Sequence, residues 1–362
     1  MSLTAKSTNM QTSFERLKAV VSEHFQLEEA LMEYDVPTFY LRQPQETKQT
    51  FLKLCKELDG MNSIAFLRHV NGRIALKIFP KSASKPSNIL INWLLFLATV
   101  GTTFITGYIL SMNLERIGGP IDPVLGGLLF TISIMSIFGL HEIGHKLSAR
   151  KNGVEATPPY FIPGPPPILG GFGTFGALIV QRSPPPNKDS LFDIGFSGPI
   201  VSFITAAVVA SIGATMAVPA QPVKEAVKWP APLAMFFIEV LFYRLGLIPK
   251  PSEGQVLYMH PMEVAGWVGM LITALNLLPV AMLDGGHIAR SLLGEKARVV
   301  LAVLSILLLV ISGFWLMALF VLFLSLQRHP GPLDDVSSLS KSRKILAAVL
   351  VAVFVLAFPI VY

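Results

Sequence analysis

Cysteine is almost absent from this chain of 362 residues, which contains Cys55 alone. A single thiol cannot form an intramolecular disulfide and cannot supply a multi-cysteine metal cluster. Both kinds of site are therefore excluded within one chain. The role that remains for Cys55 is that of a buried structural thiol.

Charged residues are also scarce. They make up 14% of the chain, whereas 52% of the residues are hydrophobic, and ordinary soluble domains carry about 25% charge. Many of the charges lie in residues 1–85, and long uncharged runs dominate after them. Several of these runs reach the roughly 20 residues that a membrane helix needs. The pattern indicates an integral, multi-pass membrane protein in a lipid bilayer.

Three further features are missing. The first 18 residues contain no apolar h-region, so we expect no cleavable secretory signal. No dense basic run is interleaved with aromatics, so the net charge of +6 does not indicate a nucleic-acid partner. Lys and Arg instead collect at the cytoplasmic ends of membrane helices. The sequence shows no internal repeat and carries no indication of oligomeric state.

Two domains are predicted. Residues 1–85 read as a small soluble α/β domain with the order helix, strand, helix and hairpin, the hairpin turning at Asn71-Gly72. Residues 86–362 read as a polytopic α-helical membrane domain with about six to eight transmembrane helices. The expected spans are 86–114, 124–147, 193–216, 264–283, 299–327 and 345–362, and residues 231–247 lie on or dip into the membrane. Ser312-Gly313 could divide the run 299–327 into a pair.

Basic residues predict the orientation of the first two spans. Lys81 and Lys85 precede the first, and Arg150 and Lys151 follow the second. Since Lys and Arg favour the cytoplasmic side, both of these ends are placed there.

The motif HEIGH, residues 141–145, ends the second apolar run. His141 and His145 are four residues apart and share one face of a helix, where they can take two positions of a tetrahedral zinc site. Glu142 lies beside them and can reach a zinc-bound water. The alternative is two histidines whose polar atoms are satisfied at a helix–water boundary. Ionisable groups at membrane depth are rare and usually functional, which favours the metal site.

The third ligand must come from elsewhere, and Asp284 ends an uncharged run. We expect Gly285-Gly286 to release the backbone there and to let the carboxylate turn inward. The alternatives are a carboxylate facing water and His287 as the competing ligand. Asn276 either binds a substrate carbonyl or a ligand, or packs as an amide between helices. Zinc would activate water and polarise the scissile carbonyl, with Glu142 as the general base.

The stretch GGFGTFGALIV, residues 170–180, alternates glycine with apolar residues. It suggests a membrane-associated β-hairpin with an exposed edge, to which an unwound substrate could add as a strand. Gly171, Phe172 and Gly173 are the candidate substrate-binding residues. The alternative is a loop that only skims the membrane.

These residues resemble the site-2 protease family of intramembrane zinc metalloproteases, and most closely its plastid and archaeal branch. The resemblance covers about 120–362 and rests on HEIGH, DIGFSGPIVSF (193–203) and NLLPVAMLDGGH (276–287). It implies an endopeptidase that cleaves transmembrane segments of membrane-protein substrates, with one zinc ion per chain. Carried over by motif, His141, His145 and Asp284 match the ligands and Glu142 matches the general base.

The chain departs from the family where Asn-Pro-x-Pro is common, since it reads Asn276-Leu277-Leu278-Pro279. No PDZ domain lies between the two motifs, so gating would use other parts, residues 1–85 among them. Two other functions stay open: a metal-binding or transport membrane protein without proteolysis, and an inactive protease scaffold. The first assigns no role to Glu142. The second would be indicated by a missing catalytic group, and all four groups are present.

Overall fold

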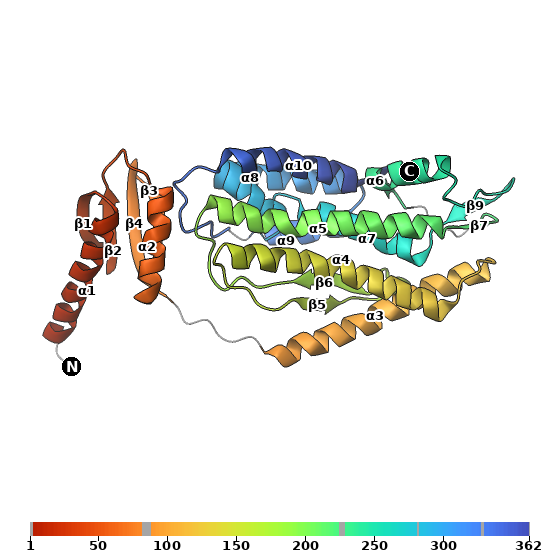
Figure 1. Cartoon of the computed structure of the whole chain (residues 1–362), viewed down its shortest axis with the longest axis horizontal. Helices are drawn as coiled ribbons and strands as arrows, with labels where there is room; N and C mark the ends of the chain where they lie inside the picture. Colours follow the sequence, from red (N-terminus) through yellow and green to blue (C-terminus); the bar gives the residue numbers. More distant parts are fainter. Residues whose placement is uncertain (1–2, 82–87, 224–228, 281, 327–328, 362) are drawn as a thin grey trace.

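The computed structural model describes residues 3–81, 88–223, 229–280, 282–326 and 329–361. The predicted linker, residues 80–86, and Lys85 lie largely outside these residues. The chain is mostly helical, with small antiparallel sheets (Figure 1).

The N-terminal part packs two helices on one four-stranded sheet. The helices are α1 (Leu3–His24) and α2 (Lys48–Gly60), and the strands are β1 (Leu27–Glu33), β2 (Val36–Leu41), β3 (Ser63–Val70) and β4 (Arg73–Pro80). The sheet is antiparallel in the order β1-β2-β4-β3. Asn71 and Gly72 turn the β3–β4 hairpin with φ of 50° and 79°, as a type I′ turn requires. The predicted hairpin is therefore found, whereas β1 was not predicted.

Within the described residues, three helices are long and apolar enough to cross a membrane: α3 (Ile89–Arg116), α4 (Pro123–Lys151) and α5 (Lys188–Thr215). Five others complete the bundle, namely α6 (Leu233–Arg244), α7 (Pro261–Asn276), α8 (Asp284–Ile311), α9 (Trp315–Ser325) and α10 (Lys341–Ala357). In Figure 1, α4, α5 and α10 run nearly parallel to one another. Contacts of α4 with α3, α5 and α7 place α4 inside the bundle.

Short strands pair in two-stranded sheets beside the helices. β5 (Tyr160–Pro163) pairs with β6 (Thr174–Leu178), and a single 3-10 turn, η1 (Pro167–Leu169), lies in their connection. Strand β7 (Val218–Ala220) pairs with β9 (Val256–Tyr258), and β8 (Ala231–Pro232) pairs with β10 (Pro359–Val361). A β-hairpin is thus present, but only its second strand, β6, lies in the stretch 170–180 where the hairpin was expected, and β5 precedes that stretch.

Two expectations about helix ends have opposite outcomes. The run 299–327 is broken at Gly313, whose φ of 80° separates α8 from α9, at the break that the sequence had left open. The run 264–283 is not one helix, because α7 ends at Asn276. Asp284 begins α8, and Gly285 and Gly286 lie inside its first turn. The expected backbone release after Asp284 was therefore wrong, and the irregular backbone precedes Asp284.

Residues 329–340, which we call the α9–α10 segment, join the N-terminal part to the bundle. Leu67 of β3 donates its N–H to Leu333 O at 2.9 Å, and Asp335 N–H returns a bond to Leu67 O at 3.2 Å. On its other side, the segment donates from Leu333 and Asp334 to Pro185 O and Pro186 O. The segment therefore lies between β3 and the residues that lead into α5, and Asp334 forms isolated parallel β-bridges with Leu67 and Asn187.

Candidate metal centre

The C-terminal half of α4 carries three ionisable side chains toward the bundle interior. His141, Glu142 and His145 are 5%, 3% and 6% exposed. Four residues make just over one helical turn, so the two imidazoles leave α4 on the same side. The predicted pair therefore faces protein rather than lipid or water.

Asp284 reaches the same point from α8. Residues 277–283 connect α7 to α8 outside any helix, with Pro279 among them, and Asp284 is the first helical residue. A side chain at Gly285 would overlap the Leu277 carbonyl, so glycine lets the first turn of α8 pack onto the end of α7. This close packing fixes the position of Asp284.

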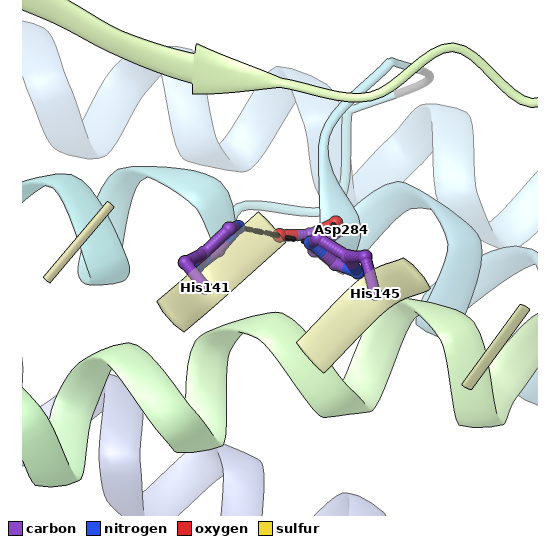
Figure 2. A group of neighbouring side chains, drawn as sticks. All are labelled: His141, His145 and Asp284. Carbon is purple, nitrogen blue, oxygen red and sulfur yellow. Dashed lines mark hydrogen bonds and ion pairs between the residues drawn. The ribbon is translucent and has the colours of Figure 1, made fainter. Parts of the chain in front are cut away.

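The three side chains converge on one point (Figure 2). His141 Nε2 and His145 Nε2 are 2.9 Å apart. The Asp284 carboxylate oxygens lie 3.3 Å from His141 Nε2 and 3.2 Å from His145 Nε2. Ligands about 2.0–2.1 Å from a tetrahedral zinc are separated from one another by about 3.3 Å. The spacing therefore fits three ligands of one such ion and leaves the fourth position open.

Hydrogen bonds at the outer ring nitrogens support this assignment. His145 Nδ1 is 2.7 Å from the Ile194 carbonyl oxygen, which can only accept, so this nitrogen carries the proton. His141 Nδ1 is 3.1 Å from the Ser202 hydroxyl. When the Ser202 hydroxyl accepts from His141, both Nδ1 atoms are protonated and the facing Nε2 atoms present two lone pairs to each other. A cation between the two Nε2 atoms stabilises this arrangement.

Glu142 stands beside this group and outside it. Its Oε1 lies 3.9 Å from His141 Nε2, which is too far for a shared first coordination sphere and close enough to reach a water held there. The carboxyl also lies next to the backbone of Ile179, just beyond β6. Glu142 can therefore act as a base toward a water or a peptide lying along that strand.

Helix α5 packs closely against the candidate metal centre through small residues. A side chain at Gly198 would overlap the His145 ring, and one at Gly144 would approach Ser197 O to 2.9 Å. The two glycines let α4 and α5 cross closely beneath the ligands. Sequence reasoning singled out the Gly198-Pro199 segment only through the family resemblance, and it missed Ser202 and Ile194.

Two other residues that the sequence singled out lie near the candidate metal centre but do not contribute a ligand to it. His287 places Nδ1 2.6 Å from His329 Nε2 and does not belong to the group of potential ligands found among the described residues. Asn276 ends α7, is half-buried and makes no side-chain hydrogen bond within the described part of the chain. Asp284 is thus the better third ligand.

The candidate substrate-binding residues lie in the connection between β5 and β6. Phe172 packs against Trp229 and Trp267, with ring centroids 5.6 and 5.8 Å away. Gly173 bonds Pro165 O through its N–H and accepts from the Thr102 hydroxyl at 2.6 Å. Gly171 packs against Pro165. These residues hold the hairpin connection against α3 and the tryptophans, and the strand that follows approaches Glu142.

The chain is similar to known proteins. The family model "Peptidase family M50" matches residues 129–319, slightly more than half of the chain. The protein named "Probable zinc metalloprotease EGY1, chloroplastic" of Arabidopsis thaliana is 27% identical over 317 residues, which are 78% of this chain and 56% of that protein.

Two rice proteins are similar as well. EGY1 of Oryza sativa subsp. japonica is 30% identical over 63% of this chain and 39% of its own length. EGY2 of Oryza sativa subsp. indica is 32% identical over 59% and 38%. The chain thus spans between 38% and 56% of the length of these relatives. No solved structure matches the chain.

Proposed function

The chain belongs to peptidase family M50, and from this membership we propose that it is an intramembrane zinc metalloprotease. Its substrates are other membrane proteins, which it cleaves within or near their transmembrane segments. The observation that carries the proposal is the convergence of His141, His145 and Asp284, with Glu142 beside them.

We assign His141 Nε2, His145 Nε2 and the Asp284 carboxylate as ligands of one zinc ion. Bound there, zinc would supply a Lewis acid that activates water and polarises a carbonyl. Glu142 takes a proton from the attacking water and returns it to the leaving amine nitrogen. Ile194 and Ser202 keep the two imidazoles oriented, and the burial of His141, Glu142 and His145 limits competing hydration.

Strand β6 is the proposed substrate-binding element. Each strand of a two-stranded sheet has one unpaired edge, and β6 packs on α4, where Gly176 lies over Phe138. In Figure 2 the yellow-green strand passes over the three side chains. An unwound substrate can pair with such an edge through its backbone. Gly171, Phe172 and Gly173 would fix the hairpin for this pairing, and Asn276 would bind the substrate backbone.

We further propose that residues 86–362 form the protease domain with six to eight spans and that residues 1–85 form a soluble domain. Arg150 and Lys151 at the end of α4 support a centre nearer the cytoplasmic side. A cysteine placed at Lys151 in a Cys55→Ser chain should resist an impermeant maleimide added outside intact cells. Rapid labelling from outside would reverse this orientation.

The proposed activity is tested with purified protein and a fluorescently labelled transmembrane peptide in detergent. Glu142→Gln should keep one zinc per chain and cleave about 10²–10⁴-fold more slowly, the range for a lost general base. Glu115→Gln, at the exposed end of α3, is the matched control and should cleave normally. Wild-type protein without zinc would overturn the metal site, and zinc-loaded Glu142→Gln with full activity would overturn the mechanism.

A further inference from the structure

A chain of side-chain hydrogen bonds crosses three helices beside the first histidine. His141 Nδ1 on α4 is 3.1 Å from Ser202 Oγ on α5. Ser202 Oγ is 2.8 Å from Thr273 Oγ1 on α7. Thr273 in turn donates to the Gly269 carbonyl one helical turn earlier, at 2.7 Å. Ser202 and Thr273 are 2% and 1% exposed, so water does not compete for these bonds.

The final carbonyl gives the chain a direction. The Gly269 oxygen can only accept, so its short contact takes the Thr273 hydrogen. The Thr273 oxygen is then free to accept from Ser202, and the Ser202 oxygen to accept from His141 Nδ1–H. Every hydrogen runs away from the imidazole. This arrangement leaves the His141 Nε2 lone pair facing Asp284 and His145.

Many hydroxyls in membrane helices bond only their own helix, and these two differ from them. Thr131 and Thr205 each donate to the carbonyl four residues earlier, at 2.8 Å. Ser202 has the carbonyl of Pro199 on its own helix at 3.2 Å, and in addition it has closer partners on two other helices. Thr273 donates within its own helix like Thr131 and Thr205, but its oxygen also meets Ser202 on α5. Gly269 permits this meeting, because a side chain there would come within about 3 Å of Ile137 and Ala206. The contact between Ser202 and Thr273 is therefore additional to the bonds within each helix.

The two histidines are restrained in different ways. His145 Nδ1 meets a backbone carbonyl, whose acceptor role cannot change. His141 Nδ1 meets a hydroxyl, which can donate or accept. A hydroxyl that turned toward Nδ1 would force the proton onto Nε2 and close the ligand position. An acceptor other than His141 must take the Ser202 hydrogen. The Thr273 oxygen at 2.8 Å is the nearer of two such acceptors, and the Pro199 carbonyl lies at 3.2 Å.

We propose that Ser202 and Thr273 are positioning residues that hold His141 in the tautomer able to bind zinc, an inference that rests on the proposed zinc site. Thr273 acts through Ser202, and neither touches the metal or the substrate. Partners of this kind typically change metal affinity about 10- to 100-fold when removed.

The test uses the full-length chain in detergent with Thr273→Val, which keeps the shape of threonine and removes the hydroxyl. Zinc affinity is measured by competition with a chromogenic chelator, and the visible spectrum of the cobalt-substituted protein reports ligand geometry. We expect Thr273→Val to weaken zinc binding about tenfold and Ser202→Ala up to about 100-fold. Thr273→Ser should restore both the affinity and the spectrum.

Thr205→Val is the matched control, since it removes a hydroxyl from α5 that bonds only its own helix. It should leave affinity and spectrum unchanged, and thermal unfolding identifies any variant that fails to fold. Thr273→Val that binds zinc as tightly as Thr205→Val would overturn the positioning role and leave the proposed function intact. Wild-type protein that binds no zinc would overturn the proposed function itself.

Discussion

At the scale of single residues, Gly198 marks the closest approach of α5 to the candidate metal centre. A Cβ there would overlap Nε2, Cε1 and Cδ2 of His145, and Nε2 is the atom assigned to the metal. The ring cannot retreat easily, because its Nδ1 bonds Ile194 O. The site therefore requires a residue without a side chain at position 198.

Gly198→Ala should weaken zinc binding at least about 100-fold, the upper end of the range for lost supporting contacts, because the added methyl displaces a ligand nitrogen itself. Chelator competition measures this affinity. The control is Gly101→Ala on α3, where an added Cβ meets nothing within 4 Å. Equal zinc affinities in the two variants would show that α5 yields at this contact and that Gly198 is not required.

Much of the centre could be predicted from the sequence, because its geometry is local. The spacing of four between His141 and His145 is enough to place both on one helix face. Asp284 was a prediction about tertiary structure, favoured by a lone carboxylate at the end of an apolar run. Ser202 and Thr273 could not be recognised, since hydroxyls in apolar helices usually bond their own backbone.

At the scale of elements, α8 shows how an irregular backbone positions a ligand. Its first turn presents Asp284, and the helix is then interrupted at Gly294, where φ is 83° and ψ is −179°. This region of backbone space is essentially restricted to glycine. The helical segment that carries Asp284, residues 284–293, is therefore oriented independently of the long apolar remainder of α8.

Gly294→Ala should destabilise the protein by about 1–3 kcal/mol, because any side chain strains this conformation even though space is available. Thermal unfolding in detergent measures the effect. Gly60→Ala at the end of α2, which also has open space but no positive φ, is the control and should be neutral or slightly stabilising. An unchanged midpoint for Gly294→Ala would mean that α8 runs straight through this position.

Strand β1 shows why one element was missed. Its sequence LEEALME consists of residues that favour helices, and only its pairing with β2 makes it a strand. The turn between them uses Tyr34 and Asp35 with φ of 51° and 64°. A two-residue turn with both φ positive normally favours Asn-Gly, so the usual sequence signal was absent. At Asn71-Gly72, where that signal exists, the hairpin was predicted correctly.

At the scale of the whole molecule, the α9–α10 segment links the soluble part to the helices of the centre. Leu333 is 7% exposed and belongs to the hydrophobic core beneath the four-stranded sheet. Lys48 of α2 forms an ion pair of 2.6 Å with Asp189 at the start of α5. Asp335 pairs with Arg290 of α8, two turns beyond Asp284. The segment therefore contacts both parts at once.

Cys55 offers a direct measure of this docking. Burial, followed by the charges of Asp334 and Asp59, raises the pKa of the Cys55 thiol to about 12. Since the thiolate is the reactive form, folded protein should be alkylated very slowly at pH 8. A raised pKa also means that Cys55 contributes stability below about pH 9 that is lost as pH rises toward 12.

Leu333→Ala removes a core side chain and should loosen the docked segment by about 2–5 kcal/mol. Cys55 then becomes less buried and Asp334 moves away from it, so the pKa of the thiol falls and alkylation at pH 8 should accelerate at least about tenfold. Met32→Ala, an exposed position on β1 of the same sheet, is the control. Slow alkylation in both variants would indicate that the segment stays docked without the Leu333 side chain.

The docking of β3 has a consequence for the order in which the molecule is assembled. Arg68 bonds the carbonyl of Leu333, a residue 265 positions away, so the partner of this strand is synthesised long after the strand itself. During translation the edge of β3 stays uncovered until α3 to α9 have been made. An uncovered strand edge readily pairs with other chains. A nascent or truncated chain that ends before Leu333 would therefore expose an edge of β3 that can pair with other chains.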